Sequence, residues 1–195
     1  MPKGSKIGKD SQYRKPLMED QLKRSMEELN RLSIQEFKGA DKLPVTIVLD
    51  NVRSMHNVGS IFRTADAFLI EKIMLCGITA RPPHREITKT ALGATESLEW
   101  HYYDTTLEVI TNLKTQGYRI FAIEQVKDSL MLDKISFEKD QKIALVFGNE
   151  VFGVEDEVLK NCDGSIEIPQ FGTKHSFNIT ISVGIVLWHY FTNRV

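Results

Sequence analysis

The chain has 195 residues, of which 42% are hydrophobic, and this suits one folded domain with a packed core. Its net charge of -1 excludes a general attraction to nucleic acid, so any such binding must come from local basic patches. Its two cysteines form no CxxC pair, and it shows neither a secretion signal nor a long apolar run. We therefore expect a cytoplasmic protein with no metal site, no disulfide framework and no membrane contact.

The N-terminal part of the chain is predicted to be a short extension. Residues 1–16 are polar and basic, and residues 17–31 carry apolar side chains near helical spacing, which predicts one amphipathic helix. The basic tail is consistent with a solvated terminus or with an arm that contacts phosphates. We expect an extension over 1–44, too small to be a domain, and one domain over 45–195.

From residue 45 onwards, strand patterns alternate with helix patterns. Apolar runs predict strands over 45–49, 72–76, 99–103, 118–123, 142–147 and 166–168. Helical spacing predicts helices over 57–69, 104–116, 154–161 and 177–192, with an irregular or partly helical stretch over 80–97. The run over 142–147 is the most apolar and is expected to be central. The alternation indicates an α/β fold with a mainly parallel sheet flanked by helices.

Polar segments with glycines follow three of these strands. They cover residues 51–65, 148–153 and 169–178. Because ligands of parallel sheets bind at the carboxyl ends of the strands, we expect the three segments to converge on one pocket. The first segment lacks GxGxxG, which argues against a dinucleotide cradle.

These segments resemble the three motifs of the SpoU (TrmH) branch of the SPOUT RNA methyltransferases. The matching residues, in motif order, are Asn57-x-Gly59-x-x-x-Arg63-x-Ala65, then Phe147-Gly148-Asn149-Glu150 with Gly153, then Ile168-Pro169 with Ser176-x-Asn178. The chain departs from the family in two places. Phe177 stands where the family commonly has Leu, and Val151-Phe152 intervene where Gly often follows the glutamate.

The resemblance implies a C-terminal trefoil knot, a homodimer, bound S-adenosylmethionine and methyl transfer to a ribose 2′-hydroxyl of structured RNA. Both tRNA and rRNA are possible substrates, and the short extension favours tRNA, since related rRNA enzymes often carry a separate RNA-binding domain. The catalytic residues implied are Arg63, Asn57, Glu150, Ser176 and Asn178. The cofactor contacts expected are Gly148, Ile168, Phe177, Phe147, Pro169 and Glu124, the last because it ends a strand at the same sheet edge.

Arg63 is the first candidate for the active centre. By resemblance it contacts the target ribose and a neighbouring phosphate, and the family mechanism often makes it the general base. A guanidinium stays protonated, however, so a phosphate clamp that stabilises a developing alkoxide is the role we favour. The alternative is a surface arginine on an amphipathic helix. Glu150 could orient Arg63, anchor its loop or bind cofactor hydroxyls.

Other candidates have plausible structural roles. Asn57 could cap its helix, Gly59 could serve helix packing rather than ligand approach, and Ser176 and Asn178 could cap the final helix. A local basic set could grip RNA phosphates or form a solvated loop face. It comprises Arg53, His56, Arg81, His84, Arg85 and Lys89.

Two other function classes are compatible with the sequence. One is a non-catalytic RNA-binding or assembly protein that retains the fold, against which the complete motif set argues. The other is an α/β protein that binds a nucleotide or flavin. The apolar faces of the first and final helices offer two surfaces for a dimer interface.

Overall fold

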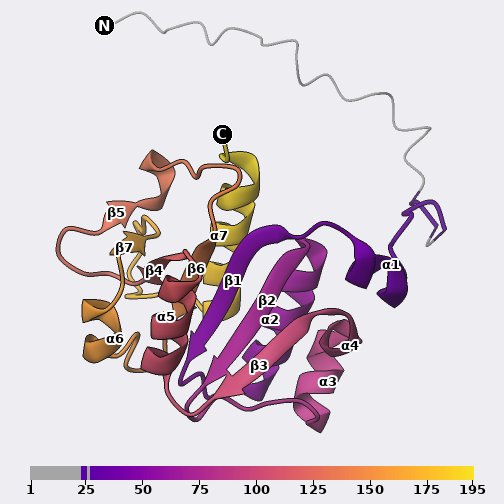
Figure 1. Cartoon of the computed structure of the whole chain (residues 1–195), viewed down its shortest axis with the longest axis horizontal. Coiled ribbons are helices and arrows are strands. Elements are labelled where there is room, and N and C mark those ends of the chain that lie inside the picture. The colour runs from indigo at the N-terminus through magenta and orange to yellow at the C-terminus, as the bar shows by residue number, and fades with distance from the viewer. Residues whose placement is uncertain (1–22, 26) are drawn as a thin grey trace, which may run out of the picture. The chain divides into compact units, whose positions relative to one another are not determined.

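The computed structural model describes residues 23–25 and 27–195, and one compact unit runs from Ser33 to Val195 (Figure 1). The basic tail over 1–16 and residues 17–22 and 26 of the predicted helix lie outside the described residues. Residues 27–30 form turns, which corrects the prediction that a helix continues to residue 31. The unit opens instead with α1 (Ile34–Gly39), whose capping box joins Ser33 and Glu36.

A parallel sheet forms the centre of this unit. Its strands are β1 (Leu43–Asp50), β2 (Ile70–Cys76), β3 (Glu99–Tyr103), β4 (Arg119–Ile123), β5 (Leu130–Met131), β6 (Ile143–Phe147) and β7 (Gly164–Glu167). They lie in the order β3-β2-β1-β6-β4-β7-β5, and all the pairings are parallel. Every residue of β6 is buried. The predicted central strand is therefore confirmed.

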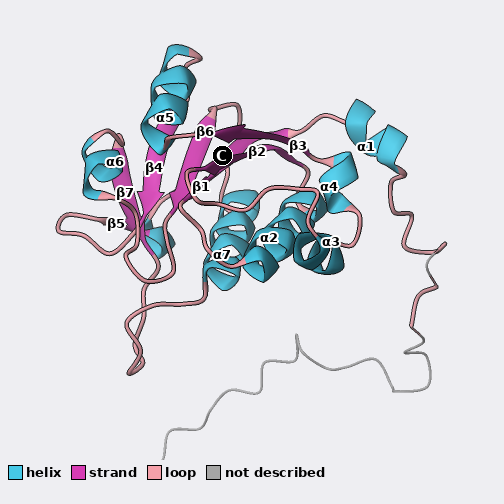
Figure 2. Ribbon diagram, turned by 90° about the horizontal axis from the view of Figure 1, so that it is seen from below, coloured by secondary structure: helices cyan, strands magenta, loops and turns pink. Residues whose placement is uncertain are grey.

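Helices cover both faces of the sheet, as Figure 2 shows. On one side lie α2 (Met55–Ala67), α3 (Arg85–Ala91), α4 (Ala94–Ser97) and α7 (Ile179–Thr192); on the other lie α5 (Thr106–Thr115) and α6 (Asp156–Lys160). Strand β1 shows why both faces need a cover. Ile47 and Leu49 belong to one apolar cluster and Val48 to the other, as expected for alternating side chains of a strand buried on both faces.

Local capping sets the helix boundaries that the apolar pattern misplaces. Helix α2 begins at Met55 rather than at residue 57, because the Ser54 hydroxyl accepts the amide of Asn57. Helix α7 begins at Ile179 rather than at residue 177, because Asn178 is its N-cap. The predicted partly helical stretch over 80–97 holds α3 and α4. The sequence patterns do not predict α1, β5 or the short 3₁₀ helix η3 (Leu132–Lys134).

The order of the strands reverses direction at the centre of the sheet. From β1 the chain moves through β2 and β3 to one edge, whereas from β6 it continues to β7 toward the other edge. The carboxyl ends of β1 and β6 therefore flank a topological switch point, where open parallel sheets bind ligands. No helix within the described residues combines the length and apolar character needed to cross a membrane.

Candidate functional site

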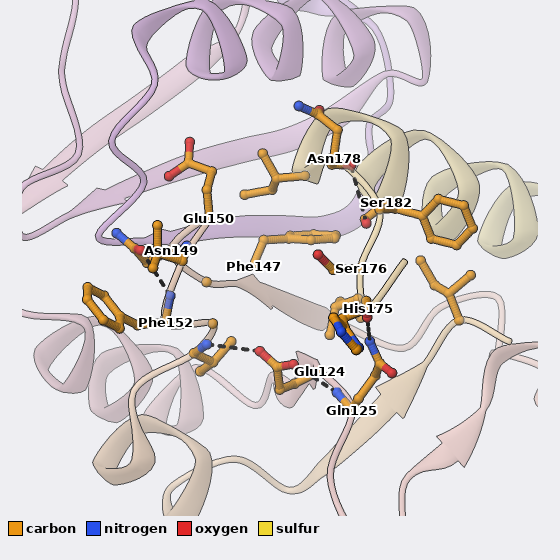
Figure 3. Close-up of a pocket in the computed structure, with 18 of the residues that line it drawn as sticks. Glu124, Gln125, Phe147, Asn149, Glu150, Phe152, His175, Ser176, Asn178 and Ser182 are labelled. Carbon is orange, nitrogen blue, oxygen red and sulfur yellow. Dashed lines mark hydrogen bonds between the residues drawn. The ribbon is translucent and has the colours of Figure 1, made fainter. Parts of the chain in front are cut away.

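A cavity of about 660 Å³ opens at the carboxyl ends of β4, β6 and β7. Glu124, Gln125, Phe147, Asn149 and Ser176 are among the side chains that surround it in Figure 3. Its volume lies in the range of pockets that hold small organic ligands, of roughly 300–1,000 Å³. The predicted convergence of loops at this sheet edge therefore produces a cavity of ligand size.

The Glu150 carboxylate joins the second motif to the start of α2. One carboxylate oxygen accepts the backbone amide of Arg53 at 3.0 Å; the other accepts the amide of Ser54 at 3.0 Å and the side-chain amide of Asn57 at 2.9 Å. Burial raises the pKa of Glu150, but these hydrogen bonds outweigh burial and leave the pKa below its ordinary value. The carboxylate is therefore charged at neutral pH and bound to a helix N-terminus that favours negative charge.

Asn57 continues this contact to the third motif. Its side-chain oxygen lies 3.4 Å from the side-chain nitrogen of Asn178, while its own amide nitrogen donates to Glu150. Asn178 in turn caps α7 by accepting the amide of Thr180 at 2.9 Å. Asn57 does not cap α2, so that interpretation was wrong, whereas the capping role of Asn178 is confirmed. The chain Glu150–Asn57–Asn178 brings the three sequence segments together.

The loop between Phe147 and Val154 is tightly constrained. Asn149 and Gly153 exchange two backbone hydrogen bonds of 2.9 Å, and Gly153 has a φ of 70°, which suits glycine. A Cβ on Gly148 would overlap backbone atoms of Gly153 and Val154. Glu124 holds the far end of the loop, since its carboxylate accepts the amide of Val154 at 3.0 Å. Only glycine at 148 and 153 therefore lets this loop close over the sheet edge.

Most of the predicted cofactor contacts surround the cavity. Glu124, Phe147, Gly148, Ile168 and Phe177 all line it. Pro169 is not in the lining, although its neighbours Ile168 and Gln170 are. Among the predicted catalytic residues, Glu150, Ser176 and Asn178 line the cavity, and Asn57 reaches it through its hydrogen bonds.

Arg63 lies outside the cavity of its own chain. It is exposed on α2 and has no hydrogen bond or ion pair with any described residue. Arg63 comes six positions after Asn57, equivalent to about 9 Å along the helix and about 240° of rotation, so the two side chains leave α2 in different directions. The prediction that all three segments meet at one pocket holds for Asn57, Glu150 and Asn178 and fails, within one chain, for Arg63.

Several members of the predicted basic set already have partners. His56 pairs with Glu86 at 3.0 Å, the Arg81 guanidinium lies 4.2 Å from the Tyr102 ring centroid, and the His84 ring accepts the amide of Glu86 as the cap of α3. The set is therefore not equally available to phosphates. The members that remain exposed without such a contact among the described residues are Arg53, Arg85 and Lys89.

Gly59 serves helix packing in this structure. A Cβ there would overlap the Thr90 hydroxyl and the carbonyl oxygen of Ile87, both on α3. Gly59 does not line the cavity, so the packing alternative explains it.

Sequence reasoning missed a buried polar group behind the site. Asp50, fully buried at the end of β1, accepts the Thr106 hydroxyl at 2.5 Å and the Glu155 amide at 3.0 Å. Next to it, the backbone carbonyl oxygen of Asn51 accepts a hydrogen bond of 2.7 Å from the side-chain amide nitrogen of Asn149. These contacts join β1 to the loop after β6. An acid followed by Asn directly after a buried strand was the available signal.

The fold and this site define a class of protein: an α/β protein with a parallel sheet and a small-ligand pocket near its switch point. Residues 44–188 match the model of the SpoU rRNA Methylase family, and the chain belongs to this family.

Individual relatives differ in how much of their length the chain spans. It is 27% identical to the tRNA (guanosine(18)-2′-O)-methyltransferase of Thermus thermophilus, covering 85% of this chain and 83% of that protein. It is 28% identical to the 23S rRNA (guanosine-2′-O-)-methyltransferase of Neisseria meningitidis, covering 74% of this chain but 56% of that protein. The AdoMet-bound rRNA methyltransferase structure from Sinorhizobium meliloti superposes with a TM-score of 0.70 and 27% identity, over 78% of this chain and 58% of that one.

Proposed function

We propose that this protein transfers a methyl group from S-adenosylmethionine to a ribose 2′-hydroxyl of tRNA or rRNA, with tRNA slightly favoured. The observation that carries the proposal is the hydrogen-bonded group Glu150–Asn57–Asn178, which unites the three motifs beside the cavity. Two relatives named as RNA 2′-O-methyltransferases support it. Such a protein would act in the cytoplasm, where its RNA substrates are found.

The cavity suits a nucleoside-like cofactor. Apolar side chains of Ile123, Phe147, Ile166 and Ile168 provide a surface for a purine ring, and Glu124 provides a hydrogen-bond acceptor for hydroxyl or amino groups. Gly148 exposes backbone atoms where no side chain fits. S-adenosylmethionine, when bound, supplies an electrophilic methyl group. The chain's own task is to hold the ribose oxygen in line with it, and alignment of this kind can contribute roughly 7–11 kcal/mol.

Within this mechanism Glu150 is a positioning residue. Its lowered pKa makes it a poor proton acceptor at neutral pH, and its oxygens already receive three donors from the start of α2. It therefore orients Asn57 and the first turn of α2 toward the cavity. The ribose hydroxyl releases its proton to solvent water, and Arg63, whose guanidinium remains charged, stabilises the negative charge that develops on the oxygen.

Because Arg63 lies outside its own cavity, we infer that a second copy of the chain supplies it. Helix α7 offers the surface for such a homodimer. Ile181, Trp188 and Phe191 lie at helical spacing on α7 and remain exposed, with Trp188 60% exposed. Helix α7 lies beside α2, which carries Arg63 (Figure 2), and Phe191 packs on Phe68 at the end of α2. Burial of this stripe would bring the two Arg63-bearing helices to the interface.

The proposal is tested with tritium-labelled S-adenosylmethionine and bulk RNA from cells that lack this gene. We expect label in tRNA or rRNA, and calorimetry should show binding of S-adenosylhomocysteine but not of FMN or NAD. The R63A variant should lose methyl transfer while its affinity for S-adenosylhomocysteine is unchanged. RNA binding without any transfer would support the non-catalytic alternative, and lost cofactor affinity in R63A would contradict the role given to Arg63.

A further inference from the structure

Phe152 is an exposed aromatic side chain at the mouth of the cavity. Its exposed fraction is 84%, and it belongs to the cavity lining, as do Asn149 and Gly153. Figure 3 shows it next to Asn149. No aromatic ring among the described residues stacks on it. The free energy of the system falls when a ring of this size leaves water. Its placement at a pocket mouth therefore favours contact with a ligand.

The backbone that carries Phe152 is held in place before any ligand binds. The Asn149 side-chain oxygen accepts the amides of Val151 at 2.9 Å and Phe152 at 3.2 Å. The same asparagine exchanges two backbone hydrogen bonds with Gly153 and donates to the carbonyl oxygen of Asn51. A ring on such a turn loses little conformational entropy when a partner stacks on it.

Charge limits what the partner can be. The segment 150–157 contains four acidic residues and no Lys or Arg; the acids are Glu150, Glu155, Asp156 and Glu157. A phosphate group would be repelled here, whereas a neutral planar group would not. Phosphates have other sites, since Arg53, Arg85 and Lys89 are exposed. A nucleobase has the flat, uncharged face that this loop accepts.

We propose that Phe152 is a stacking platform for a base of the RNA substrate, next to the nucleotide whose ribose enters the cavity. This inference rests on the proposed function and adds a base-binding subsite to it. A base inside a duplex hides both faces, so the substrate offers an unpaired or flipped-out base at this point. Stacking of this kind is tolerant of base identity, because every base has an aromatic face.

The experiment compares F152L, which keeps an apolar side chain without a ring, with F152W, which keeps a ring. Phe171 is the matched control, because it is 97% exposed and lies outside the cavity lining, and F171L makes the same chemical change. The probes are bulk tRNA for methyl transfer and a single-stranded oligoribonucleotide containing 2-aminopurine for stacking. All variants are made in the full chain.

We expect F152L to weaken RNA binding about ten- to hundred-fold and to raise KM for tRNA in proportion, with unchanged affinity for S-adenosylhomocysteine. The unaltered protein, F152W and F171L should quench 2-aminopurine fluorescence, and F152L should not. Equal RNA affinity in F152L, loss of cofactor affinity, or a changed oligomeric state would each overturn the inference. Normal methyl transfer with an unaffected F152L contradicts only the stacking role, whereas no transfer by the unaltered protein to either bulk tRNA or bulk rRNA contradicts the proposed function.

Discussion

At the scale of single residues, the site depends on one carboxylate that organises a helix terminus. Glu150 accepts the backbone amides of Arg53 and Ser54, which lie directly before α2, and fixes the Asn57 side chain. Cys76, by contrast, is a fully buried core residue outside the site. Burial raises the pKa of its thiol to about 12, so it is not a thiolate at neutral pH.

The E150Q variant should lower the free energy of unfolding by about 0.5–1 kcal/mol at neutral pH, a modest figure because the carboxylate is exposed. The pKa of Glu150 in the folded protein lies below its ordinary value, which applies in the unfolded chain. The stabilisation by the charge is therefore complete at pH values above the ordinary pKa, and it is lost as the pH falls through the pKa of the folded protein. Urea unfolding of E150Q and the unaltered protein should therefore differ at pH 7 and converge toward about pH 3.

Glu138 provides the control for this measurement. It is exposed, and its side chain has no hydrogen bond or ion pair with a described residue, so E138Q should unfold like the unaltered protein at both pH values. A difference between E150Q and the unaltered protein that persists unchanged at acid pH would show that the charge of Glu150 is not the stabilising feature.

At the scale of elements, α2 carries two of the residues to which we assign a function, Asn57 and Arg63, and its placement depends on close contact with α3. Gly59 lets the backbone of α2 approach Thr90 and Ile87 without an intervening side chain. The same helix presents Asn57 to the cavity and Arg63 to the outside. A displacement of α2 would therefore disturb both.

The G59A variant should lower the free energy of unfolding by about 1–3 kcal/mol, because its Cβ would overlap a backbone oxygen that cannot move easily. The matched control is G184A on α7, where nothing lies within 4 Å of the added Cβ. That variant should be neutral or more stable by about 1 kcal/mol, since Ala favours helix interiors over Gly. Thermal and urea unfolding measure both, and equal stability of the two variants would contradict the close packing of α2 on α3.

At the scale of the whole molecule, we propose that two copies of the chain are needed for activity. One copy holds a complete cavity and an Arg63 that points elsewhere. The exposed stripe on α7 is the surface through which a second copy would bind and supply its Arg63 to the cavity. The trefoil knot that the resemblance implies stays a prediction, as does the domain boundary at residue 45.

The W188E variant should shift the protein from dimer to monomer in analytical ultracentrifugation and should lose methyl transfer while it keeps its fold and its affinity for S-adenosylhomocysteine. A buried carboxylate at an apolar interface is the physical reason. I78E is the control, because Ile78 is 66% exposed and lies on the loop after β2 rather than on α7. A W188E monomer with full activity would contradict the supply of Arg63 by a second copy.

Much of the fold could be predicted from local pattern. The apolar run ending at Phe147 predicted a central strand, and β6 has that place. Asn178 before an apolar helix predicted a cap, and its side chain accepts the Thr180 amide. In contrast, β5 consists of two residues, Leu130 and Met131, which pair with β7. Two residues are too few for a periodic pattern, so the sequence cannot predict this strand.

The amino-acid sequence by itself determined every strand of the sheet except β5, most of the helices and the three motif segments, because periodicity, caps and glycines act between neighbours along the chain. Only the tertiary structure decided that Glu150 binds the start of α2, nearly a hundred residues earlier, and that Arg63 faces away from its own cavity. Those outcomes depend on strand order and on the rotation of α2 against α3. Both are set by packing between distant segments, which local pattern does not encode.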